Sequence, residues 1–305
     1  MENILRLKHH SRAFFTTIFF ILSFIFLVRF FIIPIFEPTL KLSFVNLSSI
    51  LLDNLFASFI VTIFIGVFVF WLTPQIMEKS IMKVIEPKEI NPLLSSAAKT
   101  SRLWIFKGSA GRYTRAVTLP TMAESARHKG LGRDIKLFLI NPDNLEICKE
   151  YAIYRKSLKS GKEQDWNIDK VKNEVLATII KTLIIKHEEP LLRIEIYLLD
   201  FFSTFRYDIS DDYAIITKED KEVSALKVDS GTYYYDSYID ELRLHERQAK
   251  KIEPIDMNEI NIENINNVNL SECISKLNIM KNTTITDNDL SYIVKSIKES
   301  KNPYK

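Results

Sequence analysis

The stretch FFILSFIFLVRFFIIPIF, residues 19–36, determines how the rest of this chain is interpreted. The run from Ala13 to Val28 contains no charged side chain, and the apolar run resumes after Arg29. A helix rises about 1.5 Å per residue, so roughly 20 apolar residues cross the hydrocarbon core of a bilayer. We therefore predict a first membrane span over residues 13–33. The run is long and no small-residue cleavage site follows it, which favours a span over a signal peptide.

A second apolar run predicts a second span over residues 54–76. It includes LFASFIVTIFIGVFVFWL, residues 55–72, and carries no charge. Two spans joined by a short loop form a transmembrane hairpin within residues 1–78.

Basic residues predict the orientation of this hairpin. They flank its two ends, whereas the loop offers only Lys41 against Glu37 and Asp53. The flanking basic residues are Arg6, Lys8, Arg12, Lys79, Lys83 and Lys88. The positive-inside rule then places both termini in the cytoplasm of a bacterial inner membrane, with Trp71 as an interfacial anchor.

Arg29 has two interpretations. In a helix that enters from the cytoplasm it lies near the outer end of the first span, where it can snorkel to the headgroups. Asp53 opens the second span at the same end, so an antiparallel hairpin brings the two charges to similar depth. An Arg29–Asp53 pair, within or between protomers, would then fix the register or line a polar path.

Composition limits the remaining function classes. The chain is 47% hydrophobic and 26% charged, with the apolar residues concentrated before residue 75. A net charge of +3 does not by itself indicate a nucleic-acid-binding protein. The two cysteines, Cys148 and Cys273, match neither a disulfide framework nor metal-ligand spacing, which fits a reducing compartment.

The remaining chain is predicted to lie in the cytosol in three parts. Residues 79–100 suit a juxtamembrane helix and a polar linker, because IEPKEINPLLSSAAK contains two prolines. Strand and helix patterns alternate over residues 101–252, which predicts an α/β domain with a largely parallel or mixed sheet flanked by helices. Residues 253–305 suit an asparagine-rich linker and a small helical tail, with helices near 270–280 and 286–300.

One stretch of this domain, FKGSAGRYTR at residues 106–115, suggests binding chemistry. A predicted strand runs into a glycine-containing turn and a helix, an arrangement that can hold a phosphate or another anion. The candidate residues are Lys107, Gly108, Gly111, Arg112 and Arg115. The spacing matches neither a Walker loop nor GxGxxG, and a tight connection with a solvated basic face remains the alternative. We predict no catalytic residue, metal site or cofactor, because no histidine has a neighbour that marks a nucleophile or a metal site.

The segment from residue 102 to residue 155 resembles the first half of a phospholipase-D-like domain, with a strand, a helix and a second strand ending in Asn-Pro. Such domains use a His-x-Lys-x4-Asp motif, and HKGLGRD at residues 128–134 lacks that spacing. The resemblance therefore implies a degenerate, binding-only domain over roughly residues 100–250. Two-span effectors of bacterial anti-phage defence, notably retron-associated ones, look similar. Such a resemblance implies partner proteins, including a reverse transcriptase with its RNA–DNA product.

We therefore expect a membrane-embedded toxic effector. Partner components hold it inactive, and on release the hairpins oligomerise and disrupt the inner membrane, because two spans cannot alone enclose a water-filled path. One alternative is a membrane-anchored phosphodiesterase or nucleotide-binding enzyme. Another is a plain membrane scaffold.

Overall fold

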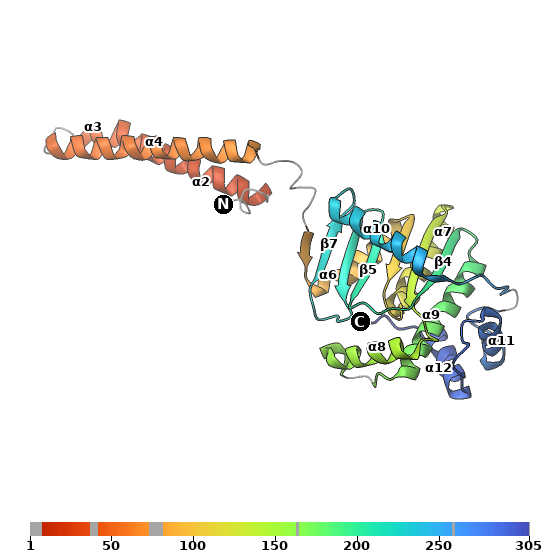
Figure 1. Cartoon of the computed structure of the whole chain (residues 1–305). Helices are drawn as coiled ribbons and strands as arrows, with labels where there is room; N and C mark the ends of the chain where they lie inside the picture. The colour runs from red at the N-terminus through yellow and green to blue at the C-terminus, as the bar shows by residue number, and fades with distance from the viewer. Residues whose placement is uncertain (1–7, 37–41, 73–81, 163–164, 258–259, 305) are drawn as a thin grey trace. The chain divides into compact units, whose positions relative to one another are not determined.

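The computed structural model describes residues 8–36, 42–72, 82–162, 165–257 and 260–304 (Figure 1). The chain divides into two compact units, Met1–Glu78 and Lys79–Lys305. Arg6, Lys41 and Lys79, on which the predicted orientation partly depends, lie outside the described residues.

Helices α2 (Lys8–Leu27), η1 (Val28–Ile32), α3 (Ile33–Phe36) and α4 (Leu42–Leu72) make up the first unit. The π turn η1 has a local cause. Pro34 has no N–H and its ring would crowd the carbonyl of the preceding turn. One wide turn, in which the Ile33 N–H donates to the Val28 carbonyl, shifts the hydrogen-bond register just before the proline. Arg29 lies within this turn.

Two helical stretches in the described residues are long and apolar enough to cross a membrane, Thr16–Ile35 and Asn46–Phe68. Their outward surfaces carry large apolar side chains, such as Phe20 and Phe64, which are 66% and 72% exposed. Helix α4 begins at Leu42, before the predicted start of the second span at residue 54. Asp53 therefore lies inside this helix and does not open it. The predicted end of that span, residues 73–76, lies outside the described residues.

An eight-stranded mixed sheet is the centre of the second unit, within the described residues, and the predicted α/β class is confirmed. The strand order is β1-β7-β6-β5-β2-β3-β4-β8. The pairs β2–β3 and β3–β4 are parallel and the other neighbours are antiparallel. The strands are β1 Met82–Ile85, β2 Leu103–Lys107, β3 Arg133–Ile140, β4 Leu192–Leu199, β5 Phe205–Ser210, β6 Tyr213–Lys218, β7 Ala225–Asp229 and β8 Lys250–Lys251.

Helices cover both faces of this sheet (Figure 1). On one face, α6, η2, α7, α8 and α9 bury the larger core, and on the other face α10 packs over residues such as Phe138 and Ile209. The helices are α6 Pro87–Thr100, η2 Thr114–Thr118, α7 Leu119–Lys129, α8 Leu145–Ser157, η3 Lys159–Gly161, α9 Ile168–Glu188, α10 Tyr233–Gln248, α11 Asn267–Leu277 and α12 Asp287–Lys298. Helix α9 is buried on nearly every side from Val171 to Ile185, because the sheet lies on one side of it and α12 on the other.

The predicted juxtamembrane helix and linker over residues 79–100 were wrong. Strand β1 and helix α6 occupy this segment, and β1 pairs with β7 at one edge of the sheet. Pro87 stands in the first turn of α6, where a missing N–H costs nothing. The Glu86 N–H donates to Glu89 Oε2 over 2.9 Å, which satisfies one end group of this helix.

Strand β5 was not predicted, since FRYDIS carries two charges inside a short apolar alternation. Arg206 and Asp208 point to the same side of the strand, as residues two apart do. The Arg206 Nε donates to Asp208 Oδ2 over 2.7 Å, so the two charges are buried as a pair. A charged pattern that would otherwise indicate a loop thus fits a buried strand.

The asparagine-rich segment, predicted to be a loosely ordered linker, is instead folded in its described part. Its asparagines form turns and caps, and the Asn266 side chain accepts from the Val268 and Asn269 N–H groups at the start of α11. Ile265 is fully buried in the core. The two predicted tail helices are confirmed as α11 and α12, and α12 packs against α9 within the second unit.

The docking of α12 on α9 gives the protein a predictable alkaline pH dependence. The Lys181 ammonium donates to the Ile297 carbonyl over 3.1 Å and to Ser300 Oγ over 2.9 Å. Burial, with Arg115 nearby, lowers the pKa of Lys181 to about 8. The unfolded chain keeps a lysine pKa of about 10.4. Between about pH 8 and pH 10 the unfolded state therefore binds more protons, and the free energy of unfolding should rise with pH by up to about 3 kcal/mol.

Lys181→Met should flatten this rise in a denaturant titration followed at several pH values. The exposed Lys276→Met in α11 serves as the matched control and should leave it intact. An equal slope in Lys181→Met and the original chain would contradict the assignment.

Candidate functional site

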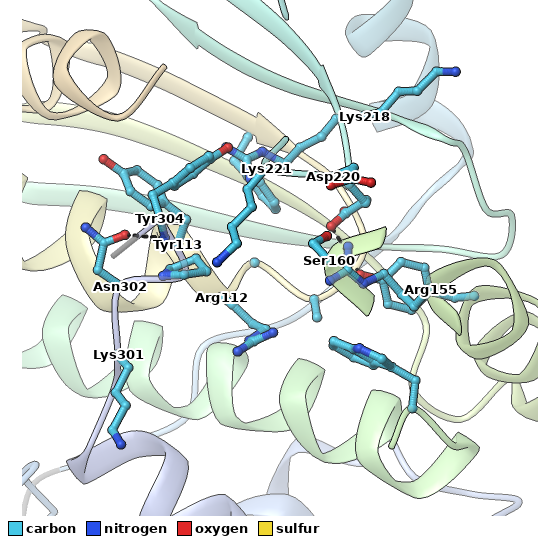
Figure 2. Close-up of a pocket in the computed structure, with 18 residues that line it drawn as sticks. Arg112, Tyr113, Arg155, Ser160, Lys218, Asp220, Lys221, Lys301, Asn302 and Tyr304 are labelled. Atoms are coloured by element: carbon cyan, nitrogen blue, oxygen red, sulfur yellow. Dashed lines mark hydrogen bonds between the residues drawn. The ribbon is translucent and has the colours of Figure 1, made fainter. Parts of the chain in front are cut away.

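A pocket of about 260 Å³ opens in the α/β unit at the carboxyl end of β2 (Figure 2). The loop after β2, helix α8, the segment around Trp166, the facing ends of β5 and β6, and residues 301–304 line it. Strand β5 runs antiparallel to β2, so its first residues lie beside the last residues of β2. The carboxyl ends of parallel strands are the usual place for ligands in α/β sheets.

Arg155, in the last turn of α8, is the most unusual residue of this pocket. It is only 7% exposed, and its Nε has no hydrogen-bond partner among the described residues. Its guanidinium carbon lies 5.0 Å from the ring centroid of Trp166, which is itself fully buried. Arg112 and Lys170 approach the same indole at 5.6 Å and 4.8 Å. Three cations thus surround one aromatic ring in one wall of the pocket.

Aromatic rings surround a second guanidinium, that of Arg206. Phe106, Tyr113 and Tyr304 each have their ring centroids within 5.8–5.9 Å of its central carbon. The rings of Tyr113 and Tyr304 pack edge to face, with centroids 5.2 Å apart. Asp208 neutralises Arg206, since its Oδ2 accepts from the Arg206 Nε over 2.7 Å. This guanidinium therefore packs among the three rings as one half of a buried ion pair.

Acceptor groups occupy the β6 side of the pocket. Glu219 accepts from the Tyr151 hydroxyl over 3.1 Å and from the Ser109 N–H over 3.4 Å. Burial, reinforced by Glu219, raises the pKa of Tyr151 well above its usual range, so the phenol stays protonated and donates. Asp220 is buried beside it, and Lys221 extends from the same segment over the pocket (Figure 2).

The loop after β2 depends on Gly111. Its φ is +64°, and a Cβ there would lie 2.9 Å from Thr178 Cγ2 and 3.1 Å from Leu139 Cδ2. A larger residue would therefore be strained and would push the loop away from α9. Gly111 sets the path of the chain that carries Arg112 and Tyr113 into the pocket.

The structure brings two of the five predicted anion-binding residues, Gly111 and Arg112, to this pocket. Lys107 does not join them, because successive side chains of a strand point to opposite faces. It is 3% exposed on the α10 side, with its Nζ 3.3 Å from Glu241 Oε1. Gly108 is packed against the rings and stems of Phe106 and Arg206.

Arg115 is a structural residue and does not face the pocket. Its guanidinium donates to Glu174 Oε2 over 2.5 Å and to Thr178 Oγ1 over 3.2 Å. The Arg112 Nε lies 3.8 Å from the other carboxylate oxygen of Glu174. Burial alone would raise the pKa of Glu174, but Arg115 and Arg112 outweigh it and hold this pKa below its ordinary value. One buried carboxylate therefore serves two arginines.

Sequence reasoning missed most of the pocket. Arg155 reads as ordinary basic charge at a helix end, and Arg206 lies in the strand that was not predicted. Residues 301–304 come from the far end of the chain, and a conventional motif search cannot connect them to residue 111. The single available signal was the glycine turn after β2.

The first unit contains a second candidate site, the Arg29–Asp53 ion pair. The Arg29 Nε donates to Asp53 Oδ1 over 3.1 Å, and a second guanidinium nitrogen lies 3.4 Å from Oδ2. At about 1.5 Å per residue, both charges lie about 10 Å inside the apolar stretches Thr16–Ile35 and Asn46–Phe68. The Asp53 side chain remains 60% exposed at the hairpin surface. Charged groups at such depth are costly and tend to be functional.

The pocket presents guanidinium, ammonium, phenol and carboxylate groups, which together suit an anion that also carries hydrogen-bond donors. Within the described residues, no group of three or more histidine, cysteine, aspartate or glutamate side chains converges as a metal site would require. The chain matches no protein-family model and none of the curated proteins compared with it. The pocket and the hairpin therefore carry the assignment of function.

Proposed function

We propose that this protein is a membrane-embedded effector in which the α/β unit binds a controlling ligand or partner and the apolar hairpin acts on the bilayer. The observation that carries the proposal is the Arg29–Asp53 ion pair between two apolar helices. A simple anchor needs no charge about 10 Å inside an apolar span, where a charge remains unfavourable although it costs less than the roughly 2.5–3.5 kcal/mol of a span centre.

In this proposal both termini and the α/β unit lie in the cytoplasm, as the basic flanks of the spans indicate. Several hairpins assemble, because two spans cannot enclose a water-filled path. The ion pair, exposed at the hairpin surface, then faces the interior of the assembly. The resemblance to two-span anti-phage effectors supports a defence role in which partner proteins restrain the chain until infection.

Expression of the full chain without other components should depolarise bacterial cells, because nothing then restrains assembly. A voltage-sensitive dye and growth curves measure the effect. The chain from residue 79 onwards, which retains the compact α/β unit, is the control and should leave the membrane potential unchanged. A normal potential and normal growth, with the full chain present in the membrane fraction, would contradict the proposal.

The cationic pocket also favours a second candidate, a membrane-anchored enzyme that acts on a phosphodiester. The full chain and the chain from residue 79 onwards also distinguish the enzyme from the effector. Hydrolysis of bis(p-nitrophenyl) phosphate by the chain from residue 79, lost on Arg112→Gln, would support the enzyme. Toxicity that requires the hairpin supports the effector.

A further inference from the structure

The pocket in the α/β unit contains a buried cation, Arg155, that no other described residue neutralises. The Arg155 side chain is only 7% exposed. Within the described residues its Nε has no hydrogen-bond partner and its guanidinium forms no ion pair. A buried charge without a partner is strongly unfavourable. The Trp166 ring lies against the Arg155 guanidinium, but an indole ring supplies no carboxylate or carbonyl acceptor. The Trp166 Nε1 also has no hydrogen-bond partner within the described residues. An anion bound in the pocket would supply the missing acceptor.

Further cations reach the same space from other elements. Arg112 follows the glycine turn after β2, and Lys221 follows β6 (Figure 2). Lys218 and Lys301 are exposed at the rim. A phosphate group is the ligand chemistry that guanidinium and ammonium groups on several sides recognise best.

The opposite wall of the pocket suits a planar ring. Tyr113 and Tyr304 pack edge to face beside the guanidinium of Arg206. Tyr304 is the more exposed of the two rings, and aromatic faces stack on nucleobases. Glu219 and Asp220 add carboxylate acceptors for hydroxyl or amino donors. The volume of about 260 Å³ is close to the lower end of typical small-molecule sites.

We infer that this pocket binds a nucleotide, with phosphate against Arg155, Arg112 and Lys221 and the base towards Tyr113 and Tyr304. The ribose or the base donates to Glu219 or Asp220. This inference deepens the proposed function, because it names the class of ligand that the α/β unit senses. Residues 301–304 form one wall, so the bound ligand also contacts the end of the chain that follows α12.

The test measures binding of AMP, ATP and GTP to the full chain in detergent micelles by calorimetry, with adenosine and pyrophosphate as separate probes. Arg155→Gln should weaken binding of the preferred nucleotide by about 10- to 150-fold, the range for a charge-assisted hydrogen bond. Arg193→Gln on β4, an exposed arginine paired with Asp134, is the matched control and should bind as the original chain does.

Two further readouts separate this role from a structural one. Arg155→Gln should raise the melting temperature of the ligand-free chain, because it removes a buried charge that has no acceptor. Tyr304→Ala should weaken nucleotide binding and leave pyrophosphate binding unchanged.

Three outcomes would overturn the inference: no nucleotide binds, Arg155→Gln binds as well as the original chain, or Tyr304→Ala affects nucleotide and pyrophosphate alike. Because these experiments read ligand affinity and not membrane potential, this inference and the proposed function fail independently.

Discussion

Glu174→Ala should lower the free energy of unfolding of the α/β unit by about 3–5 kcal/mol, the cost of breaking a buried ion pair. Glu174 is 4% exposed on α9 and accepts from Arg115 on one oxygen and from the Tyr292 hydroxyl, over 2.8 Å, on the other. Its removal leaves Arg115 buried without a counter-charge. It also releases Arg112 and one of the contacts that dock α12 on α9.

Chemical denaturation followed by tryptophan fluorescence measures this change, since Trp104 and Trp166 both lie in the core of the unit. Glu174→Gln keeps the shape and removes the charge, so it should recover only part of the loss. Glu150→Ala, on the exposed side of α8, is the matched control and should change the unfolding free energy by less than about 0.5 kcal/mol. A loss below about 1 kcal/mol in Glu174→Ala would contradict the central role of this carboxylate.

The acid limb of the stability curve provides an independent check. A carboxylate whose pKa is lower in the folded state adds stability above its unfolded pKa, about 4.3 for glutamate. That stability is lost as the pH falls through the folded pKa. The original chain should therefore lose stability more steeply below about pH 4.3 than Glu174→Gln does.

Periodicity and end signals made much of this fold predictable from the sequence. Helix α7 ends at Gly130, whose φ of +62° fits the predicted glycine stop. The alternation in residues 191–200 and the apolar helix before it are strong local patterns, and both β4 and α9 formed as expected. In these segments the local preference and the tertiary environment agree.

Predictions failed where one interaction overrides a local preference. Pro87 and Pro92 indicate a linker, but α6 begins at Pro87, contains Pro92 in its interior, and buries Ile90 and Leu94. The charges of Arg206 and Asp208 interrupt the apolar alternation of β5, which was not predicted, but they neutralise each other within the strand. The asparagines near residue 266 indicate disorder, but they cap α11. In β5 and at the start of α11 the partners lie only two or three residues away, but these pairs form only once the strand or the helix is in place.

The candidate site was predictable only where its residues follow one another along the chain. Gly111 and Arg112 belong to a strand–turn–helix pattern, which the sequence displays. Lys107 and Arg115 belong to the same pattern but do not line the pocket. Strand alternation directs Lys107 to the other face of the sheet, where it pairs with Glu241, and Arg115 pairs with the buried Glu174. Arg155 and Tyr304 reach the pocket through tertiary folding, and no spacing rule relates them.

In the effector proposed above, reversal of the Arg29–Asp53 ion pair should have the largest effect on function. Arg29→Asp leaves two carboxylates facing each other inside the hairpin, and Asp53→Arg leaves two guanidiniums there. Like charges at this depth repel and stay unpaired, so each single variant should lose depolarising activity by at least about tenfold, which corresponds to only about 1.4 kcal/mol. The double variant Arg29→Asp with Asp53→Arg restores an opposite-charge pair at the same position and should recover most of the activity.

The double variant Arg29→Leu with Asp53→Leu distinguishes two roles of the ion pair. The pair either lines a polar path through the assembly or only fixes the register of the two helices. Replacement of an ion pair in a low-dielectric environment by apolar residues of similar volume is often neutral or stabilising. The double leucine variant should therefore insert and assemble normally, as crosslinking in the membrane fraction measures. It should not depolarise cells if the charges line a polar path, and it should depolarise them if the pair only fixes the register.

Phe64→Leu, on the exposed apolar face of α4, is the control for altered packing. If the charge-reversed double variant performs no better than either single reversal, Arg29 and Asp53 do not act as a direct pair, because a true pair recovers when both charges exchange places.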